Sequence, residues 1–354
     1  MTVKPIVIDN GGAYLRIGIS GMEGPKTVKV NAIARNKKDK KILICDKILA
    51  SPSYILSRPM NRGLIEDWET QKLIWEKNFE KKNFAVITIA PFAPEMAKQD
   101  MYELLFSEFQ FQNCLVIESS IAAQFSPGIV SQFTKDDWDN PCGLLIDVGF
   151  SNTYVIPVFN TLPVPGASVR LPIGGRVLNN ILKERLAYSQ VDLEDNPLLI
   201  QNIRETICEV RLKNSEWNEK KYYLLPDFAH FGKAIDSACP NSIQLSADRF
   251  AVYETLFTPK TFGVDSIGLA ECVELSISKC PAEMREAMWK KIILVGGLAM
   301  AKGFVDRLKE ELPVRRILTE TDGRFDLSVW RGAASFNQES DLAALGAVNR
   351  DQWY

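Results

Sequence analysis

Residues 143 to 153 read Gly143-Leu-Leu-Ile-Asp147-Val-Gly149-Phe-Ser151-Asn-Thr153, and this stretch decides the fold that the sequence predicts. Its apolar, β-branched run predicts a buried strand that ends in a carboxylate and a turn containing glycine. A second stretch near the N-terminus has the same order: Pro5-Ile-Val-Ile-Asp9-Asn-Gly11-Gly12-Ala-Tyr-Leu-Arg16-Ile-Gly18. Glycine lets the backbone of each turn pass close to a ligand. The spacing of the two stretches matches one α/β domain and suggests two similar halves.

Two turns of this kind can face each other across a cleft. Each would then offer backbone N–H groups to a phosphate and an aspartate to the metal ion that accompanies it, which together form a nucleotide clasp. The alternative is that each stretch is only a β-hairpin with an Asp-Gly turn. A third glycine-rich turn, Gly296-Gly297-Leu-Ala-Met300-Ala-Lys-Gly303, again follows a buried strand and favours the clasp.

Length and composition exclude several classes of function. A chain of 354 residues, 46% of them hydrophobic, predicts two domains with cores of their own. The formal charge of −2 gives no whole-protein attraction to nucleic acid or to an anionic membrane. Seven cysteines without a CxxC spacing, no signal peptide and no apolar run of transmembrane length predict reduced intracellular thiols and no membrane contact. His230 is the only histidine, which excludes a histidine-dependent triad and a multi-histidine metal site.

Hydrophobic periodicity predicts alternating strands and helices in the first half, with mainly parallel strands. The expected strands are 6–9, 15–20, 28–34, 84–90 and 114–117, and the expected helices are 68–79, 95–109 and 119–125. Asp67 is the expected N-cap of the first helix. Four lysines within residues 37–41 form either solvated surface or a nuclear-import patch.

The second half repeats this plan with larger insertions. The expected strands are 152–159 and 168–172, and the expected helices are 177–187, 196–209, 271–279, 282–291 and 305–312. Residues from about 213 to 250 show little periodicity and are predicted to form an irregular lobe. Its aromatic residues are Trp217, Tyr222, Tyr223, Phe228 and Phe231. Such rings either anchor a partner protein or pack the lobe's own small core, and both interpretations stay open.

Short motifs spread over nearly the whole chain carry a family resemblance. In order they are Asp9-Asn-Gly11, Thr88-x-Ala90-Pro91, Asp147-x-Gly149, Gly174-Gly175-Arg176, Arg204-Glu205, Gly296-Gly297-x-x-Met300 and Trp330-Arg-Gly332-Ala333. This set resembles actin and the actin-related proteins. Sugar kinases and heat-shock chaperone ATPases share the clasp, but not the Thr-x-Ala-Pro, Gly-Gly-x-x-Met and Trp-x-Gly motifs together.

The resemblance implies an actin-like fold, which is a duplicated ribonuclease H-like α/β fold. Two similar α/β domains then surround a nucleotide cleft and carry inserted subdomains. The first domain would span residues 1–142, with a small subdomain around 30–62. The second would span residues 143–354, with a lobe around 186–262, and we expect residues 313–354 to pack back on the first domain.

The same resemblance implies a set of nucleotide contacts. The positions are Asp9, Asn10, Gly11, Gly12, Arg16, Asp147, Gly149, Ser151, Gly175, Arg204, Glu205, Gly296, Gly297 and Met300. Two of them, Asp9 and Asp147, would hold a metal ion weakly and through water. The implied cofactor is ATP or ADP with Mg²⁺, and the alternative is an empty cleft.

Three departures from the actin pattern bear on catalysis. At the first turn, actin's small hydroxyl residue and its lysine are matched by Gly12 and Arg16, which lose a side-chain phosphate contact but keep a positive charge. At the second turn, Phe150 matches a carboxylate. The water-orienting glutamine has no equivalent near Ser120, although Gln124 lies one turn further on. Phosphoryl transfer needs positioned water and neutralised charge. We therefore expect nucleotide binding without hydrolysis, and no catalytic residue.

Within the family, the likeness is to the actin-related protein 6 group. The cues are Leu104-Leu-Phe106-Ser-Glu-Phe109-Gln-Phe111-Gln, Val148-Gly-Phe150-Ser151, Leu225-Pro-Asp227-Phe228, Asp248-Arg-Phe250-Ala-Val-Tyr-Glu254-Thr-Leu-Phe257 and Asn337-Gln-Glu-Ser-Asp341. This likeness implies a scaffold subunit, in the nucleus with a cytoplasmic pool, of a chromatin-remodelling complex of the Swr or SRCAP type. Such a complex exchanges a variant histone into nucleosomes. The implied partners are the remodeller ATPase and a zinc-finger HIT protein, with the nucleosome contacted indirectly.

Two other functions remain open. One is an ATP-hydrolysing filament protein or kinase-like enzyme of the same fold, and the other is an actin-related subunit of another assembly such as dynactin. The stretch between Val30 and Arg58 is shorter than its counterpart in actin. The residues leading up to Tyr354 do not resemble the C-terminal tail of actin. We therefore expect a subunit of a hetero-complex and not a homopolymer.

Overall fold

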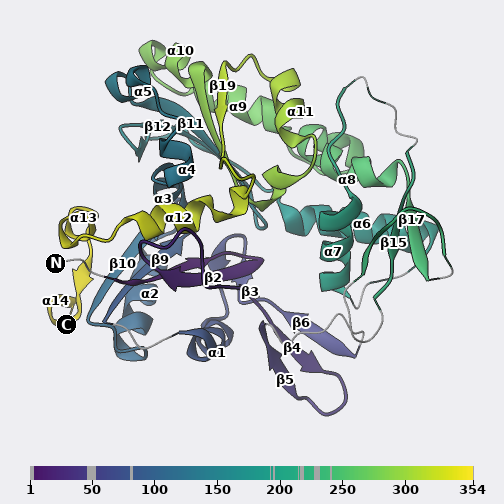
Figure 1. The fold of residues 1–354 in the computed structure, drawn as a ribbon, viewed down its shortest axis with the longest axis horizontal. Coiled ribbons are helices and arrows are strands. Elements are labelled where there is room, and N and C mark those ends of the chain that lie inside the picture. Colours follow the sequence, from purple (N-terminus) through teal and green to yellow (C-terminus); the bar gives the residue numbers. More distant parts are fainter. Residues whose placement is uncertain are drawn as a thin grey trace.

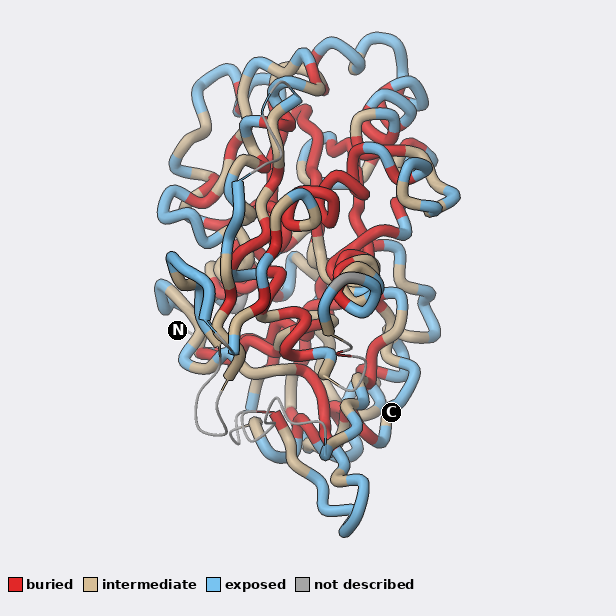
Figure 2. Tube along the Cα trace, turned by 90° about the vertical axis from the view of Figure 1, so that its right-hand side faces the viewer, coloured by how far each residue is buried: buried red, intermediate tan, exposed pale blue. Residues whose placement is uncertain are grey.

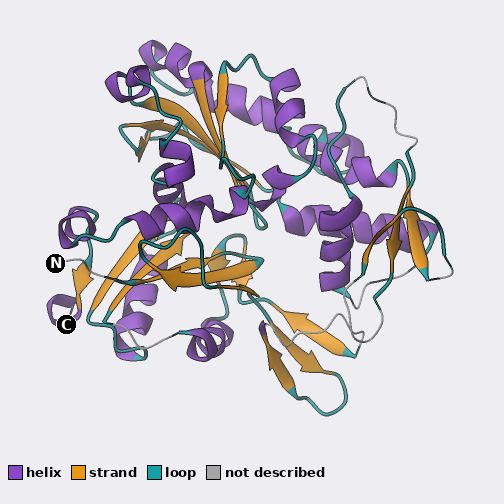
Figure 3. Cartoon of the chain, in the orientation of Figure 1, coloured by secondary structure: helices purple, strands orange, loops and turns teal. Residues whose placement is uncertain are grey.

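The computed structural model describes residues 4–45, 53–79, 83–191, 193, 196–213, 215, 219–226, 232–239 and 241–353. Its centre consists of two six-stranded sheets, which lie one above the other in the view of Figure 1. Helices flank both sheets, and smaller sheets project at the periphery (Figure 3). The mixed α/β architecture expected from the sequence is confirmed.

The first six-stranded sheet has the order β20-β10-β9-β1-β2-β3. These strands are β20 (Val348–Asn349), β10 (Asn113–Glu118), β9 (Phe84–Ile89), β1 (Ile6–Asn10), β2 (Tyr14–Ile19) and β3 (Thr27–Val30). Strands β1 and β2 form an antiparallel hairpin, whereas β9 runs parallel to β1 and β10 runs parallel to β9. The late strand β20 pairs with β10, so the C-terminal segment adds a strand to this first sheet.

The second six-stranded sheet repeats this pattern. Its strands are β13 (Leu162–Pro163), β12 (Thr153–Phe159), β11 (Cys142–Val148), β18 (Lys291–Val295), β19 (Arg316–Leu318) and β14 (Val169–Leu171). Here β11 and β12 form the antiparallel hairpin, β18 runs parallel to β11, and β19 runs parallel to β18. The turns after β1 and β11 therefore occupy equivalent places, and Asp9 and Asp147 lie at the ends of equivalent strands.

The eight predicted helices are all present, each within two residues of its expected ends, and six further helices of the described residues were not predicted. They are α1 (Trp68–Asn78), α2 (Glu95–Ser107), α3 (Ser119–Gln124), α4 (Pro127–Val130), α5 (Lys135–Asp139), α6 (Gly175–Ser189), α7 (Pro197–Ile207), α8 (Asp248–Phe257), α9 (Leu269–Ser278), α10 (Ala282–Lys290), α11 (Phe304–Glu311), α12 (Ser328–Ser335), α13 (Glu339–Ala344) and α14 (Arg350–Trp353). Short 3₁₀ helices are η2 (Pro259–Phe262), η3 (Gly297–Met300) and η4 (Phe325–Leu327). The predicted cap of α1 is confirmed, because the Asp67 carboxylate accepts the Thr70 N–H at 2.9 Å.

The single strand predicted over residues 28–34 is wrong. The chain leaves β3 at Val30 and then enters a separate three-stranded sheet. In that sheet β4 (Ile33–Asn36) pairs with β5 (Ile42–Ile44) and β6 (Tyr54–Ser57). Asn31 lies at this break, where its N–H donates to the Ala13 carbonyl and its side-chain amide donates to the Gly11 carbonyl. The break therefore follows from polar contacts with the first turn, which a hydrophobic pattern does not reveal. A two-stranded hairpin, β7 (Met60–Asn61) with β8 (Leu64–Ile65), follows β6.

The prediction of an irregular lobe over residues 213–250 is also wrong. Three strands form an antiparallel sheet there, β15 (Lys221–Leu224) between β16 (Lys233–Ile235) and β17 (Ser242–Leu245), and α8 begins within the same segment. Tyr223 is fully buried, its hydroxyl donates to Asn202 at 2.5 Å, and its ring belongs to the large apolar cluster of the second half. Six residues named in the sequence analysis lie outside the described residues, namely Trp217, Asp227, Phe228, His230, Phe231 and Tyr354.

One buried apolar cluster joins the two large sheets, and buried segments run through the centre of the molecule in Figure 2. It contains Val7 of β1, Leu145 of β11 and Trp330 of α12. The Trp330 indole N–H donates to the Val7 carbonyl at 3.1 Å, and a Cβ built at Gly18 would lie 2.5 Å from the Trp330 ring. Helix α12 therefore seats against the first sheet only because Gly18 has no side chain. Among the described residues, no helix has both the length and the apolar character needed to cross a bilayer.

Candidate functional site

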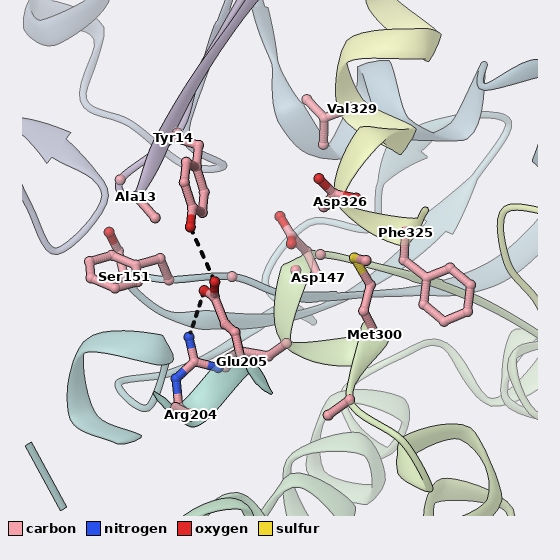
Figure 4. Close-up of a pocket in the computed structure, with 18 of the residues that line it drawn as sticks. Ala13, Tyr14, Asp147, Ser151, Arg204, Glu205, Met300, Phe325, Asp326 and Val329 are labelled. Carbon is pink, nitrogen blue, oxygen red and sulfur yellow. Dashed lines mark hydrogen bonds and ion pairs between the residues drawn. The ribbon is translucent and has the colours of Figure 1, made fainter. Parts of the chain in front are cut away.

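A cavity of about 840 Å³ lies where the turns of the two large sheets approach each other (Figure 4). Most of the predicted contact positions line it: Asp9, Asn10, Gly11, Gly12, Arg16, Asp147, Gly149, Ser151, Arg204, Glu205, Gly296, Gly297 and Met300. Gly175 does not line the cavity formed by the described residues. It lies behind Phe150, where an added Cβ would come within 2.8 Å of that ring.

The first two turns are built alike. The Gly11 N–H donates to the Tyr14 carbonyl, and the Gly149 N–H donates to the Asn152 carbonyl, each at 3.1 Å. These two glycine N–H groups are therefore used within their own turns. Helix α6 begins directly behind the second turn, because the Gly175 N–H donates to the Gly149 carbonyl at 3.1 Å.

The third turn needs glycine for a different reason. Gly296 has φ of +100°, and a Cβ there would lie 2.4 Å from the Val148 carbonyl oxygen. Its N–H donates to the Phe325 carbonyl at 3.1 Å, which ties the turn to η4. Met300 follows on η3 and is 41% exposed, so its side chain forms a pliable apolar edge of the cavity.

Arg16 does not present a free charge to the cavity, although the sequence suggested that it could replace a phosphate-binding lysine. Its guanidinium pairs with Asp9 at 3.0 Å and with Asp326 at 3.2 Å. The other Asp9 oxygen accepts the Thr88 hydroxyl at 3.0 Å. Burial raises the pKa of the Asp9 carboxyl, and the contacts with Arg16 and Thr88 oppose that rise.

Asp147 is the second carboxylate of the predicted metal pair. Burial, and then the neighbouring charge of Asp9, raises the pKa of Asp147 to about 7, while Arg16 lowers it. A carboxylate in this state is stabilised by a cation placed nearby. Among the described residues, no cluster of three or more His, Cys, Asp or Glu side chains could hold a metal. The metal contact through water stays a prediction.

Asn10 lines the cavity, but its side chain makes its hydrogen bonds to other residues of the first half. Its amide donates to Gln71, and its carbonyl oxygen accepts the Asn31 amide, both at 3.2 Å. The same oxygen also accepts the Trp75 indole N–H at 3.4 Å. Asn10 therefore anchors the first turn to α1 and to the start of β4.

A polar network crosses the mouth of the cavity. The Tyr14 hydroxyl donates to Glu205 at 3.1 Å, and Arg204 pairs with Glu205 at 3.1 Å (Figure 4). Gln201 of α7 donates to the Tyr14 hydroxyl at 3.0 Å and accepts from Arg58 at 3.0 Å. The first and second halves are thus joined here without a ligand.

Arg204 of α7 is buried, although its side chain is charged. It is only 2% exposed, and its guanidinium bonds the Tyr253 hydroxyl at 2.9 Å and Asn179 at 2.7 Å. The spacing of apolar residues along α7 shows which face of the helix is apolar. It does not reveal that α6 and α8 cover the face that carries Arg204. Arg204 consequently has a fixed orientation towards Glu205.

Phe150 lies on the second turn where actin's pattern has a carboxylate. The Arg58 guanidinium stacks over its ring at 4.8 Å from the centroid. Burial lowers the pKa of Arg58 to about 10, and its Nη1 donates to the Ala13 carbonyl at 2.9 Å. Gln124 does not reach the cavity, since its amide donates to the carbonyls of Ser120 and Thr161 at 2.9 and 3.0 Å.

Two cavity residues, Tyr14 and Asp326, were missed in the sequence, and so was Arg58, which packs on the cavity residue Phe150. Tyr14 belongs to the first glycine-rich turn, but the sequence gives no sign that its hydroxyl contacts α7. Arg58 and Asp326 lie outside the three glycine-rich turns that indicated the clasp. Their roles depend on partners far away in the sequence, so no local signal could have identified them.

Comparison with known proteins agrees with this geometry. The profile of the actin family, described as Actin, matches residues 1–199 and 193–346. Actin-related protein 6 of rice (Oryza sativa subsp. indica) is 27% identical, with 96% of this chain and 94% of the rice protein covered. Actin-related protein 6 of Arabidopsis thaliana is 26% identical, with 96% and 94% covered.

A relative of another kind matches a slightly shorter part of the chain. Centractin of Saccharomyces cerevisiae is 27% identical over 87% of this chain and 82% of the yeast protein. Identity alone therefore does not separate the two kinds of relative, whereas the rice and Arabidopsis proteins match more of this chain than centractin does. The chain belongs to the actin family, as an actin-related protein of the actin-related protein 6 type with the predicted actin-like fold.

Proposed function

We propose that this chain is a non-catalytic nuclear subunit of a chromatin-remodelling complex of the Swr or SRCAP type, which exchanges a variant histone into nucleosomes. Its similarity to actin-related protein 6 of rice and Arabidopsis over nearly its whole length supports this assignment. The proposed role is that of a scaffold. Its partners are the remodeller ATPase and a zinc-finger HIT protein, and it does not polymerise with itself.

A nucleotide fits the cleft as a structural ligand. The Ser151 hydroxyl is buried between the turns and has no hydrogen-bond partner among the described residues. The raised pKa of Asp147 marks a carboxyl that a nearby cation would stabilise. A bound ATP or ADP with Mg²⁺ would supply a polyanion together with its counter-ion. Asp9 and Asp147 would hold the ion through water, while Arg204 and Glu205 border the other end of the cavity.

Phe150 carries the proposal that bound nucleotide is not hydrolysed. An apolar ring covered by Arg58 offers no acceptor to a hydrated metal ion. Gln124, the one glutamine on α3, is held by two carbonyl groups and orients no water in the cavity. Hydrolysis depends on positioned water and on neutralised charge in the transition state. Both contributions are therefore weakened.

Single-turnover hydrolysis of bound ATP tests the first part of the proposal. We expect no product above a protein-free control, and a rate equal to that of an active actin-fold ATPase would contradict it. Co-purification from nuclear extract tests the second part, with the zinc-finger HIT protein and the remodeller ATPase detected by specific antibodies. Recovery of dynactin subunits in their place would favour the second candidate, an actin-related subunit of that assembly, which the similarity to centractin brings forward. Sedimentation with Mg-ATP should leave the chain in the supernatant.

A further inference from the structure

The Ser151 hydroxyl is a buried polar group without a partner. It follows the glycine of the second turn, lines the cavity, and has no hydrogen bond to any described residue. Figure 4 shows Ser151 near Ala13 of the first turn, on the side of the cavity away from Phe325. Buried hydroxyls in native proteins are usually hydrogen-bonded, so an orphan at the wall of a cavity indicates a missing acceptor.

Gly12 of the first turn faces this hydroxyl directly. A Cβ built at Gly12 would lie 2.5 Å from the Ser151 Oγ and 3.5 Å from the Phe150 ring. Real Cβ atoms do not approach another heavy atom that closely, so Gly12 and Ser151 share one space. Only one of the two turns can place a side chain there, and in this chain it is the second turn.

The surroundings indicate which ligand the hydroxyl would meet. A Cβ built at Gly11 would lie 3.6 Å from the Arg16 Nη1, and this guanidinium is paired with Asp9 and Asp326. The wall at this point thus combines a hydroxyl donor with two turns whose glycines carry no side chain. A phosphate oxygen is a strong acceptor for such a hydroxyl donor.

We propose that Ser151 donates the side-chain hydrogen bond to the phosphate chain of a bound nucleoside di- or triphosphate, and that Gly12 is glycine to leave it room. This inference rests on the proposed nucleotide binding. It places the phosphate-contacting hydroxyl on the second turn, whereas the actin pattern has a hydroxyl residue at the position of Gly12. The two positions form a reciprocal pair.

The test measures binding of ATP and of adenosine by calorimetry to four proteins: the wild type, S151A, G12S and the double variant with Gly12→Ser and Ser151→Gly. We expect S151A to bind ATP about tenfold more weakly, the loss of one hydrogen bond to a charged group, and to bind adenosine unchanged. G12S should bind ATP more weakly still because its side chain meets Ser151. The double variant should recover to within about threefold of the wild type, because the hydroxyl is then supplied by the first turn.

Thermal unfolding without nucleotide is the control for folding. S151A should melt at or above the wild-type temperature, because the deleted hydroxyl has no partner to lose. Wild-type ATP affinity in S151A, an equal loss for adenosine, or a double variant no better than G12S would each overturn the inference while leaving nucleotide binding intact. A wild type that binds no ATP would instead overturn the proposed nucleotide binding, and this inference with it.

Discussion

Arg16 and Asp326, 310 residues apart in the sequence, form an ion pair of 3.2 Å at the wall of the cleft. The second arm of Arg16 binds Asp9 at 3.0 Å, and Arg324 holds both oxygens of Asp326 at 2.9 and 3.0 Å. Arg16 and Asp9 lie on the hairpin of the first sheet, whereas Asp326 lies on η4 just before α12. One guanidinium therefore ties these segments together in the absence of a ligand.

Replacing Arg16 by glutamine should destabilise the protein strongly. Asp9 would lose its charged partner in a buried place, and Asp326 would keep only Arg324. Breaking a buried pair by removing one partner typically costs about 3–5 kcal/mol, and we expect a loss near 3 in the free energy of unfolding measured with urea. Arg324→Gln is the matched control, because the Arg324 side chain is 46% exposed and its loss should cost under about 1 kcal/mol. Equal losses for the two variants would contradict the role of Arg16 in joining the first hairpin to η4.

The same ion pair shows where sequence reasoning reached its limit. Each strand and turn of the clasp could be predicted, because an apolar run followed by Asp and Gly is a local pattern. The partners of Arg16 could not, since one of them is Asp326, which lies 310 residues away in the sequence. The lobe strands were missed because they are only three or four residues long and carry lysine, tyrosine, serine or glutamine next to apolar residues. Short, polar strands resemble loops in any pattern based on hydrophobicity.

Asp147 should make stability depend on pH between about pH 4 and 7. Its folded-state pKa is about 7 and its ordinary value is 3.8, so in this window the folded state binds a proton that the unfolded state has released. Stability therefore falls as pH rises through the window, by at most about 4 kcal/mol for a shift of this size. Urea unfolding at pH 5 and pH 7.5, with EDTA present, would measure this decline. Asp147→Asn should flatten it, and an unchanged slope in that variant would assign the pH dependence to other groups.

Gly332→Ala should disrupt the packing of α12 on α3. A Cβ at this position would lie 1.8 Å from the Ala122 carbonyl oxygen and 3.2 Å from the Ser126 nitrogen. Both neighbours are backbone atoms, which cannot move aside as a side-chain tip would, so we expect a loss of about 3 kcal/mol in urea unfolding. Gly24→Ala is the control, because nothing lies within 4 Å of a Cβ built there. A Gly332→Ala protein as stable as the Gly24→Ala protein would show that α12 can shift freely.

Restoring a carboxylate at the second turn should not restore ATP hydrolysis. In Phe150→Asp the new carboxylate would face the Arg58 guanidinium, which now lies 4.8 Å from the ring centroid, so the charge would be paired and the variant should fold. The cleft would still lack a side chain that orients the attacking water, since Gln124 remains bound to the carbonyls of Ser120 and Thr161. The activation barrier for hydrolysis should therefore stay high. Each missing factor of ten in rate corresponds to about 1.4 kcal/mol in the barrier. Single-turnover assays of wild type and Phe150→Asp should both show no product, whereas Phe150→Ala serves as the control for loss of the ring alone. Measurable turnover in Phe150→Asp would mean that the Phe150 ring alone prevents hydrolysis and that no water-orienting glutamine is needed.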